Sequence, residues 1–329
     1  MAFENFCTYF KNFIPKKNLD QPLVRMQYLM GTLVTIEVAG MQEAPGIEAI
    51  YAAFEEMRRI ENLLSRFIES SDISRLNATP QHKSKLISRE CKEVLQASVF
   101  FGELSQGQFD VTLAGIQDLW RQAKVNKKLP DKSELDQALN ETGYQHIFVD
   151  KNKGTVLIAS NGVSLDLGGI GKGYAVDKAV DCLKDLGVKE ATINAGGNIY
   201  HLSATEQPFG IKNPQDPNAD PIAVIQLCDQ ALATTANYEQ GFEIGGKSYG
   251  HILNAQTGYP CESNILSTSV IAESAMIADA LSTCLFLMGD KLVNALNELG
   301  CKTSLTTVNG THLTLNIDSR MLLTGVSNS

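Results

Sequence analysis

An aspartate and a threonine lie four positions apart in a segment that has the composition of a helix. Asp279 and Thr283 belong to residues 278–283 (ADALST), and positions four apart fall on one face of an α-helix. A carboxylate and a hydroxyl are hard oxygen ligands of the kind that Mg²⁺ uses, with water and substrate phosphates in its other positions. An exposed aspartate beside a threonine that bonds its own helix backbone would give the same spacing.

A glycine-rich segment, residues 166–173 (DLGGIGKG), stands between a predicted strand and a predicted helix. Glycines let a backbone approach a ligand closely, and a helix N-terminus attracts anions. Lys172 adds a cation at this positive end, which is unfavourable unless an anion such as a phosphate binds there too. The spacing matches neither a P-loop nor the G-x-G-x-x-G motif. A plain strand-to-helix turn remains an alternative.

Two further segments carry groups suited to catalysis or binding. His251 opens residues 251–258 (HILNAQTG), and a loop histidine can act as a general base near neutral pH. Asn194, Gly196 and Gly197 follow a short predicted strand, and paired glycines allow positive φ and close approach to a ligand. A surface histidine and a tight turn are the simpler interpretations.

The periodicity of apolar residues predicts the elements that position these groups. Helices are predicted over residues 46–64, 91–104, 132–139, 173–186 and 274–288, and strands over residues 33–38, 156–158, 164–166, 191–193, 223–227, 268–272 and 313–315. Helices and strands alternate irregularly, which indicates an α+β fold, with two lobes packed as one unit.

Length and composition limit the class of protein. The 329 residues are 43% hydrophobic and 20% charged, which is enough for a globular core. The formal net charge of −9 argues against nucleic-acid binding. Residues 1–20 are predicted to be a flexible leader, and residues 21–329 a single two-lobed catalytic domain. The cysteines include no C-x-x-C pair, so a zinc site is not indicated. No stretch approaches the roughly 18 apolar residues of a membrane span.

The N-terminal segment has no apolar signal core, and Cys7 does not stand in the small-residue context of a lipoprotein cleavage site. These features predict a cytoplasmic protein. A periplasmic, membrane-anchored form is the alternative if the true start differs.

Taken in order along the chain, these and other segments resemble the ApbE family, the FAD:protein FMN transferases. The matching segments are residues 30–32 (MGT), 65–67 (SRF), 74–77 (SRLN), 109–112 (FDVT), 166–177 (DLGGIGKGYAVD), 194–199 (NAGGNI), 234–239 (TTANYE), 251–260 (HILNAQTGYP) and 278–289 (ADALSTCLFLMG). The resemblance implies a two-lobed, T-fold-like α+β architecture with FAD in the cleft between the lobes.

The resemblance also implies a Mg²⁺-dependent reaction. A threonine or serine hydroxyl of an acceptor flavoprotein, within an Asp-Gly-Ala/Ser-Thr-like stretch, attacks FAD; FMN becomes bonded through its phosphate, and AMP leaves. A Mg²⁺-dependent FAD pyrophosphatase that gives FMN and AMP is an alternative that needs the same groups. A passive flavin-binding protein is an alternative of another class.

Individual roles follow from the same resemblance. It implies that Asp279, Thr283 and the backbone carbonyl of Gly171 bind the metal, and that His251 deprotonates the acceptor hydroxyl. The positions expected to contact FAD are Met30, Phe67, Lys172, Asp177, Asn194, Gly196 and Gly197.

Overall fold

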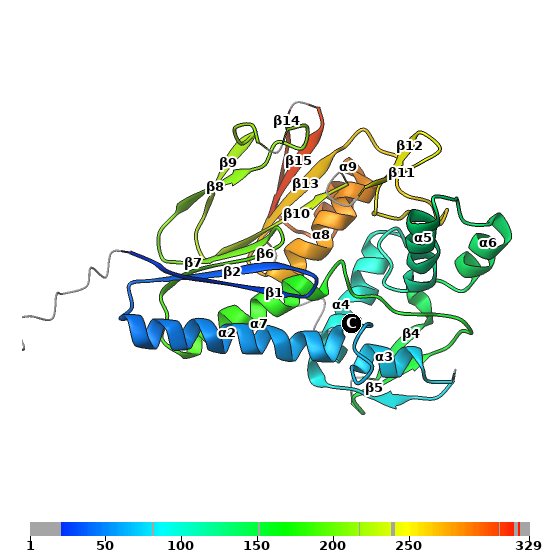
Figure 1. Cartoon of the computed structure of the whole chain (residues 1–329), viewed down its shortest axis with the longest axis horizontal. Coiled ribbons are helices and arrows are strands. Elements are labelled where there is room, and N and C mark those ends of the chain that lie inside the picture. Colours follow the sequence, from blue (N-terminus) through cyan, green and yellow to red (C-terminus); the bar gives the residue numbers. More distant parts are fainter. Residues whose placement is uncertain are drawn as a thin grey trace, which may run out of the picture.

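A computed structural model describes residues 21–80, 82–150, 152–216, 218–237, 241–308, 310–318 and 322. Figure 1 shows a large sheet with helices packed against it and a second group of helices to one side. The predicted leader, residues 1–20, lies outside the described residues, as do the last two residues of the 234–239 segment.

An eight-stranded sheet forms the main body of the protein. In sheet order its strands are β1 (Leu23–Leu29), β2 (Thr32–Ala39), β6 (Glu190–Ala195), β7 (Asn198–Leu202), β10 (Gln230–Ala236), β13 (Ser267–Ala272), β15 (His312–Ile317) and β14 (Thr303–Val308). Neighbours pair in antiparallel fashion except β13 and β15, which are parallel. Alternation buries Val34, Ile36 and Val38 on one face of β2.

Helices cover that apolar face of the sheet. They are α2 (Glu43–Leu64), α7 (Gly171–Asp185), α8 (Ala275–Met288) and α9 (Asp290–Glu298). In α2, Ile50, Phe54 and Met57 recur at steps of three and four and are fully buried. Helix α8 packs on α7 and on strands β10 and β13, so most of its surface is buried. This burial on several sides explains the long apolar run in the sequence of α8.

A second group of elements lies beside the sheet, at the right of Figure 1. It contains α3 (Asp72–Asn77), β3 (Lys85–Leu86), α4 (Arg89–Leu104), α5 (Ala114–Asn126), α6 (Lys132–Asn140), the short 3-10 helix η1 (Tyr144–His146), β4 (Ile147–Asp150) and β5 (Thr155–Ile158). A separate apolar cluster joins Trp120 of α5 and Leu135 of α6 to Leu253. The loop that carries His251 is therefore packed against this group.

Two hairpins complete the described fold. One is formed by β8 (Gln207–Ile211) and β9 (Ala223–Leu227), and the other by β11 (Phe242–Ile244) and β12 (Lys247–Tyr249). The mixture of helices and mainly antiparallel strands confirms the predicted α+β fold. Among the described residues, no helix combines the length and the apolar character needed to cross a bilayer.

The strand predicted over residues 164–166 is wrong. Ser164 forms only an isolated bridge to Leu113. The next residue, Leu165, has both of its backbone groups bonded to one side chain: its N–H donates to Asn77 Oδ1 at 2.8 Å, and its carbonyl accepts from Asn77 Nδ2 at 3.0 Å. A side chain thus replaces the neighbouring strand that a ladder would need.

Candidate functional site

The glycine-rich turn rests directly on helix α8. The Gly173 N–H donates to Asp279 Oδ2 at 3.0 Å. A side-chain carbon on Gly173 would overlap the Ala275 carbonyl oxygen and lie 2.8 Å from Asp279 Cβ, and one on Gly169 would lie 3.8 Å from Thr283 Oγ1. Because position 173 is a glycine, the turn can approach α8 closely enough to bond Asp279, and Gly169 in the same turn lies within ordinary contact distance of Thr283.

The oxygen donors at this contact fit Mg²⁺. The Asp279 residue is 5% exposed, and a buried carboxylate needs compensating positive charge. Thr283 Oγ1 lies 3.3 Å from Thr235 Oγ1, so a second hydroxyl stands beside it. Among the described residues no group of three His, Cys, Asp or Glu side chains is placed to hold a metal. A Mg²⁺ ion here would therefore depend on hydroxyl, carbonyl and substrate oxygens, the donors that it prefers.

A pocket of about 120 Å³ brings four predicted site residues together: Met30, Phe67, Gly171 and Lys172. Lys172 Nζ donates to the Gly168 carbonyl at 2.7 Å, so its charge stays at the N-terminus of α7. A volume of this size encloses only a fragment of a dinucleotide, since small-molecule pockets reach about 300–1,000 Å³. The rest of such a ligand would extend over the open surface.

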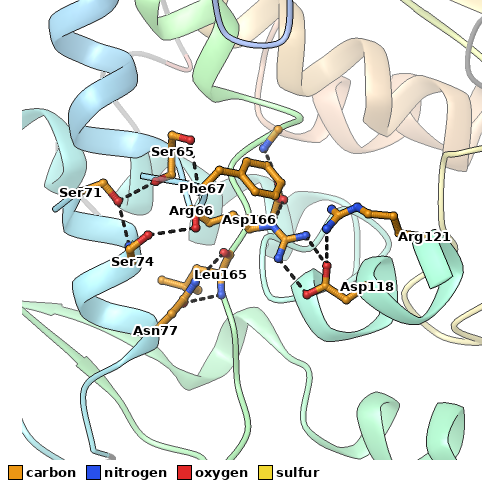
Figure 2. Close-up of polar contacts among 11 residues, drawn as sticks. Ser65, Arg66, Phe67, Ser71, Ser74, Asn77, Asp118, Arg121, Leu165 and Asp166 are labelled. Atoms are coloured by element: carbon orange, nitrogen blue, oxygen red, sulfur yellow. Dashed lines mark hydrogen bonds and ion pairs between the residues drawn. The ribbon is translucent and has the colours of Figure 1, made fainter. Parts of the chain in front are cut away.

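Phe67 offers a large aromatic surface beside the pocket. It is 70% exposed, although apolar side chains of this size usually bury most of their area. Two guanidinium groups lie over its ring, Arg66 at 4.7 Å and Arg121 at 5.2 Å from the ring centre (Figure 2). Two cation–π contacts hold the ring in place while part of it stays open. A planar aromatic ligand could stack there.

Arg66 joins helix α5 to the glycine-rich turn. Its guanidinium donates two hydrogen bonds to Asp118, at 2.8 and 3.0 Å, and a third to Asp166 Oδ2 at 2.5 Å (Figure 2). Asp166 Oδ1 in turn accepts from the Gly168 N–H at 2.7 Å. Hydrogen bonding to Arg66 holds the pKa of the Asp118 carboxyl below its usual range. Arg66 thereby sets the start of the turn.

Serine side chains fix the loop that carries Arg66 and Phe67. Ser71 Oγ donates to the Ser65 carbonyl at 2.6 Å, and Ser74 Oγ donates to the Arg66 carbonyl at 3.0 Å (Figure 2). These bonds replace the helical partners that the backbone loses when α2 ends at Leu64. The 65–67 and 74–77 segments of the family resemblance therefore act as one structural unit.

Removing the Arg66 guanidinium should destabilise the fold as well as the site. The Arg66 side chain is only 10% exposed, and Arg66→Ala leaves Asp166 and Asp118 without it. We expect the free energy of unfolding to fall by about 3 kcal/mol, measured by urea denaturation. Arg121→Ala is the control, since its pair with Asp118 is half exposed and should contribute at most about 1 kcal/mol. Equal effects of the two changes would contradict this account.

His251 lies just after β12 and near the cations Lys172 and Lys124. The residue is exposed, and the charges of Lys172 and Lys124 act on its ring. Desolvation, together with these charges, lowers the pKa of His251 to about 4. The ring is therefore a neutral base near pH 7, close enough to Lys172 to experience its charge.

Asp177 caps the helix that carries Asp279. Its carboxylate accepts hydrogen bonds from Ser274 Oγ at 2.6 Å and from the N–H groups of Ala275 and Met276 at 2.7 and 3.0 Å. Burial raises the pKa of Asp177 to about 6. The hydrogen bonds act in the opposite direction, because they stabilise the charged carboxylate. Asp177 is not among the residues that line the pocket. Its contacts position α8, and a contact with FAD stays a prediction.

The turn that contains Asn194, Gly196 and Gly197 packs on the first strands of the sheet. Asn194 Oδ1 accepts from the Gly197 N–H at 3.1 Å. Gly196 has φ +59°, and a side-chain carbon there would lie 3.0 Å from Thr32 Cβ. Thr32 begins β2, two residues after Met30. The turn therefore adjoins the strand connection that reaches the pocket, and its own contact with FAD remains a prediction.

The sequence indicated the individual groups but not their connections. Asp118 and Arg121 were missed, because they lie on α5, for which no helix was predicted. The Arg66 partners Asp118 and Asp166 are 52 and 100 positions away. The only sign of these contacts in the sequence was Arg66 itself, which stands between Ser65 and Phe67 and needs acidic partners if it is buried.

Comparison with known proteins places the chain in a family. The model of the ApbE family matches residues 30–304. A FAD:protein FMN transferase of Treponema pallidum is 30% identical over 283 residues, 80% of this chain and 78% of the relative. The crystal structure of the ApbE protein of Thermotoga maritima is 32% identical, with a TM-score of 0.79 over 89% of this chain and 96% of that chain. The flavin transferase ApbE of Vibrio cholerae is 20% identical and shares the fold, with a TM-score of 0.74 over 92% of this chain and 99% of that one. The chain belongs to the ApbE family.

Proposed function

We propose that the protein transfers FMN from FAD to a threonine or serine hydroxyl of an acceptor flavoprotein, releases AMP and depends on Mg²⁺. The relatives named FAD:protein FMN transferase support flavin transfer. The observation that carries the rest is the contact between the glycine-rich turn and α8. It sets Asp279 against Gly173 and Thr283 near Gly169, in the turn whose Gly171 and Lys172 line the pocket.

The residues of this chain divide the work of the reaction. Lys172 holds positive charge at the N-terminus of α7, where a phosphate of FAD would bind. The exposed ring of Phe67 stacks on a planar part of the dinucleotide. Asp279, Thr283 and the Gly171 carbonyl would hold Mg²⁺, which when bound neutralises the charge of the pyrophosphate.

His251 supplies the base. Its neutral ring takes the proton from the acceptor hydroxyl as the hydroxyl oxygen attacks the FMN phosphorus. A new O–P bond forms, the P–O bond of the pyrophosphate bridge breaks, and AMP leaves with that electron pair. The acceptor is thereby joined to FMN through a phosphoester.

Incubation with an acceptor tests this function. The purified protein, FAD and Mg²⁺ are mixed with a carrier protein that displays an Asp-Gly-Ala-Thr stretch in an exposed loop. We expect a fluorescent flavin band that survives a denaturing gel and release of one AMP per flavin attached. A carrier with alanine in place of the threonine is the matched control and should stay unlabelled.

The two other candidate functions predict different products. A Mg²⁺-dependent pyrophosphatase would give free FMN and AMP without a carrier and would leave the carrier unlabelled. A passive flavin-binding protein would bind FAD and leave it intact. Either result would contradict the proposed transfer, provided that the same carrier is labelled by a relative of known transferase activity.

A further inference from the structure

The entry to the His251 loop is limited by one side chain. Gly250 links β12 to His251, and its φ lies outside the left-handed region, so its backbone conformation does not require glycine. A side-chain carbon on Gly250 would overlap the Oδ1, Cγ and Nδ2 atoms of Asn237. The close contact at position 250 is therefore made by the side-chain amide of Asn237.

Asn237 is itself fixed by the sheet. It follows β10 directly, and its N–H donates to the Leu266 carbonyl at 3.2 Å. Its Oδ1 atom is buried and has no hydrogen-bond partner among the residues that the structure describes. A buried amide oxygen without a partner is unfavourable. The amide of Asn237 therefore contributes at this position through packing against Gly250 and not through a hydrogen bond of Oδ1.

The far side of the His251 loop is also held. The Cys261 N–H donates to the Ile252 carbonyl at 2.7 Å, and the Asn254 N–H donates to the Tyr259 carbonyl at 2.8 Å. Trp120 Nε1 donates to the Gly258 carbonyl at 2.7 Å. These bonds fix the loop after His251. The position of the residues before His251 therefore depends on the contact between Gly250 and Asn237.

We propose that Asn237 is a positioning residue for His251. Its amide packs against the Gly250 α-carbon and sets the point at which the loop leaves β12, which places the imidazole at the site. This inference rests on the proposed function, in which His251 is the base. It assigns to Asn237, in the 234–239 segment, a role in placing the base.

Gly250→Ala tests the contact. Because the Asn237 Oδ1 atom is buried, the amide has little room to turn aside, and we expect the added methyl group to displace the loop instead. A displacement of about 1 Å can reduce a reaction about 10²-fold. We expect kcat for flavin transfer to the Asp-Gly-Ala-Thr carrier to fall by about that factor, with KM for FAD nearly unchanged. Gly115→Ala is the matched control: apart from its chain neighbours and the backbone of its own helix, no described atom lies within 4 Å of the added carbon, and its φ is ordinary, so transfer should stay at the wild-type rate.

The double variant Asn237→Ala with Gly250→Ala provides the decisive measurement. It removes the three atoms that the methyl group would overlap, so transfer should return to within about tenfold of the wild-type rate. If Gly250→Ala alone fails to fold, the double variant should fold and transfer. Wild-type activity in Gly250→Ala, or no recovery in the double variant, would overturn the inference.

His251→Ala separates this inference from the proposed function. If His251→Ala transfers FMN as fast as the wild type, the proposed base is wrong. If His251→Ala is inactive while Gly250→Ala is fully active, the base is correct and Asn237 does not position it.

Discussion

Replacing Asp279 with asparagine should lower FMN transfer by about 10³-fold or more while the protein stays folded. The amide oxygen of asparagine can still accept the hydrogen bond that Gly173 N–H donates to Asp279 Oδ2, and the side-chain volume is conserved. What is lost is the negative charge that would hold Mg²⁺ on α8. The rate should be measured against Mg²⁺ concentration, and the saturable rise expected for the wild type should be absent.

Asp181→Asn is the matched control for this change. Asp181 lies on α7 and its carboxylate is 61% exposed in a pair with Lys178, so the substitution removes the same charge outside the site. Its transfer rate and Mg²⁺ dependence should equal those of the wild type. A normal Mg²⁺ dependence in Asp279→Asn would show that α8 does not hold the metal, even if the rate has fallen.

The elements that carry the site could be predicted because their sequences satisfy one simple pattern each. Strand β2 alternates apolar and polar residues, and helix α7 carries an apolar stripe that ends before Gly187, where φ is +80°. Of the two elements predicted to flank the glycine-rich turn, the helix after it is confirmed, and the strand over residues 164–166 before it is not. The turn itself begins α7 at Gly171, two residues earlier than predicted.

Elements without a strong pattern were missed. Helix α5 begins after Leu113 without a side-chain cap, and its polar face includes Asp118 and Arg121, which serve Arg66 and Phe67. The strand wrongly predicted over residues 164–166 also reflects a contact that local sequence cannot show. The Asn77 side chain bonds the Leu165 backbone across 88 positions, and no local pattern reports a contact of that range.

The site was predictable as a set of residues and only partly as a geometry. Met30, Phe67, Gly171 and Lys172 line one pocket, although the first two are far from the others in sequence. Sequence patterns did not show that Gly173 is needed to bring the turn onto α8, because that need arises from the distance between two helices. Nor did they show that Asp177 caps α8.

The acid limb of the transfer reaction should lie well below the ordinary histidine pKa of about 6.5. Desolvation, Lys172 and Lys124 lower the pKa of His251 to about 4. Because the lowered pKa keeps the ring neutral, kcat/KM should stay constant as the pH falls from about 8 to about 6. It should then decline with a midpoint at about pH 4.

Two lysines near the C-terminal end of α5 allow the electrostatic cause to be tested apart from the base itself. Lys124→Ala removes a charge that disfavours the imidazolium, so the midpoint should rise toward about 6.5 by less than about one unit. Lys128→Ala removes an exposed charge just beyond the same helix and should leave the midpoint unchanged. In His251→Ala the rate should fall about 10²–10⁴-fold and this limb should disappear. A limb that persists in His251→Ala would assign the titration to another group, and the neutral imidazole would then not be the base.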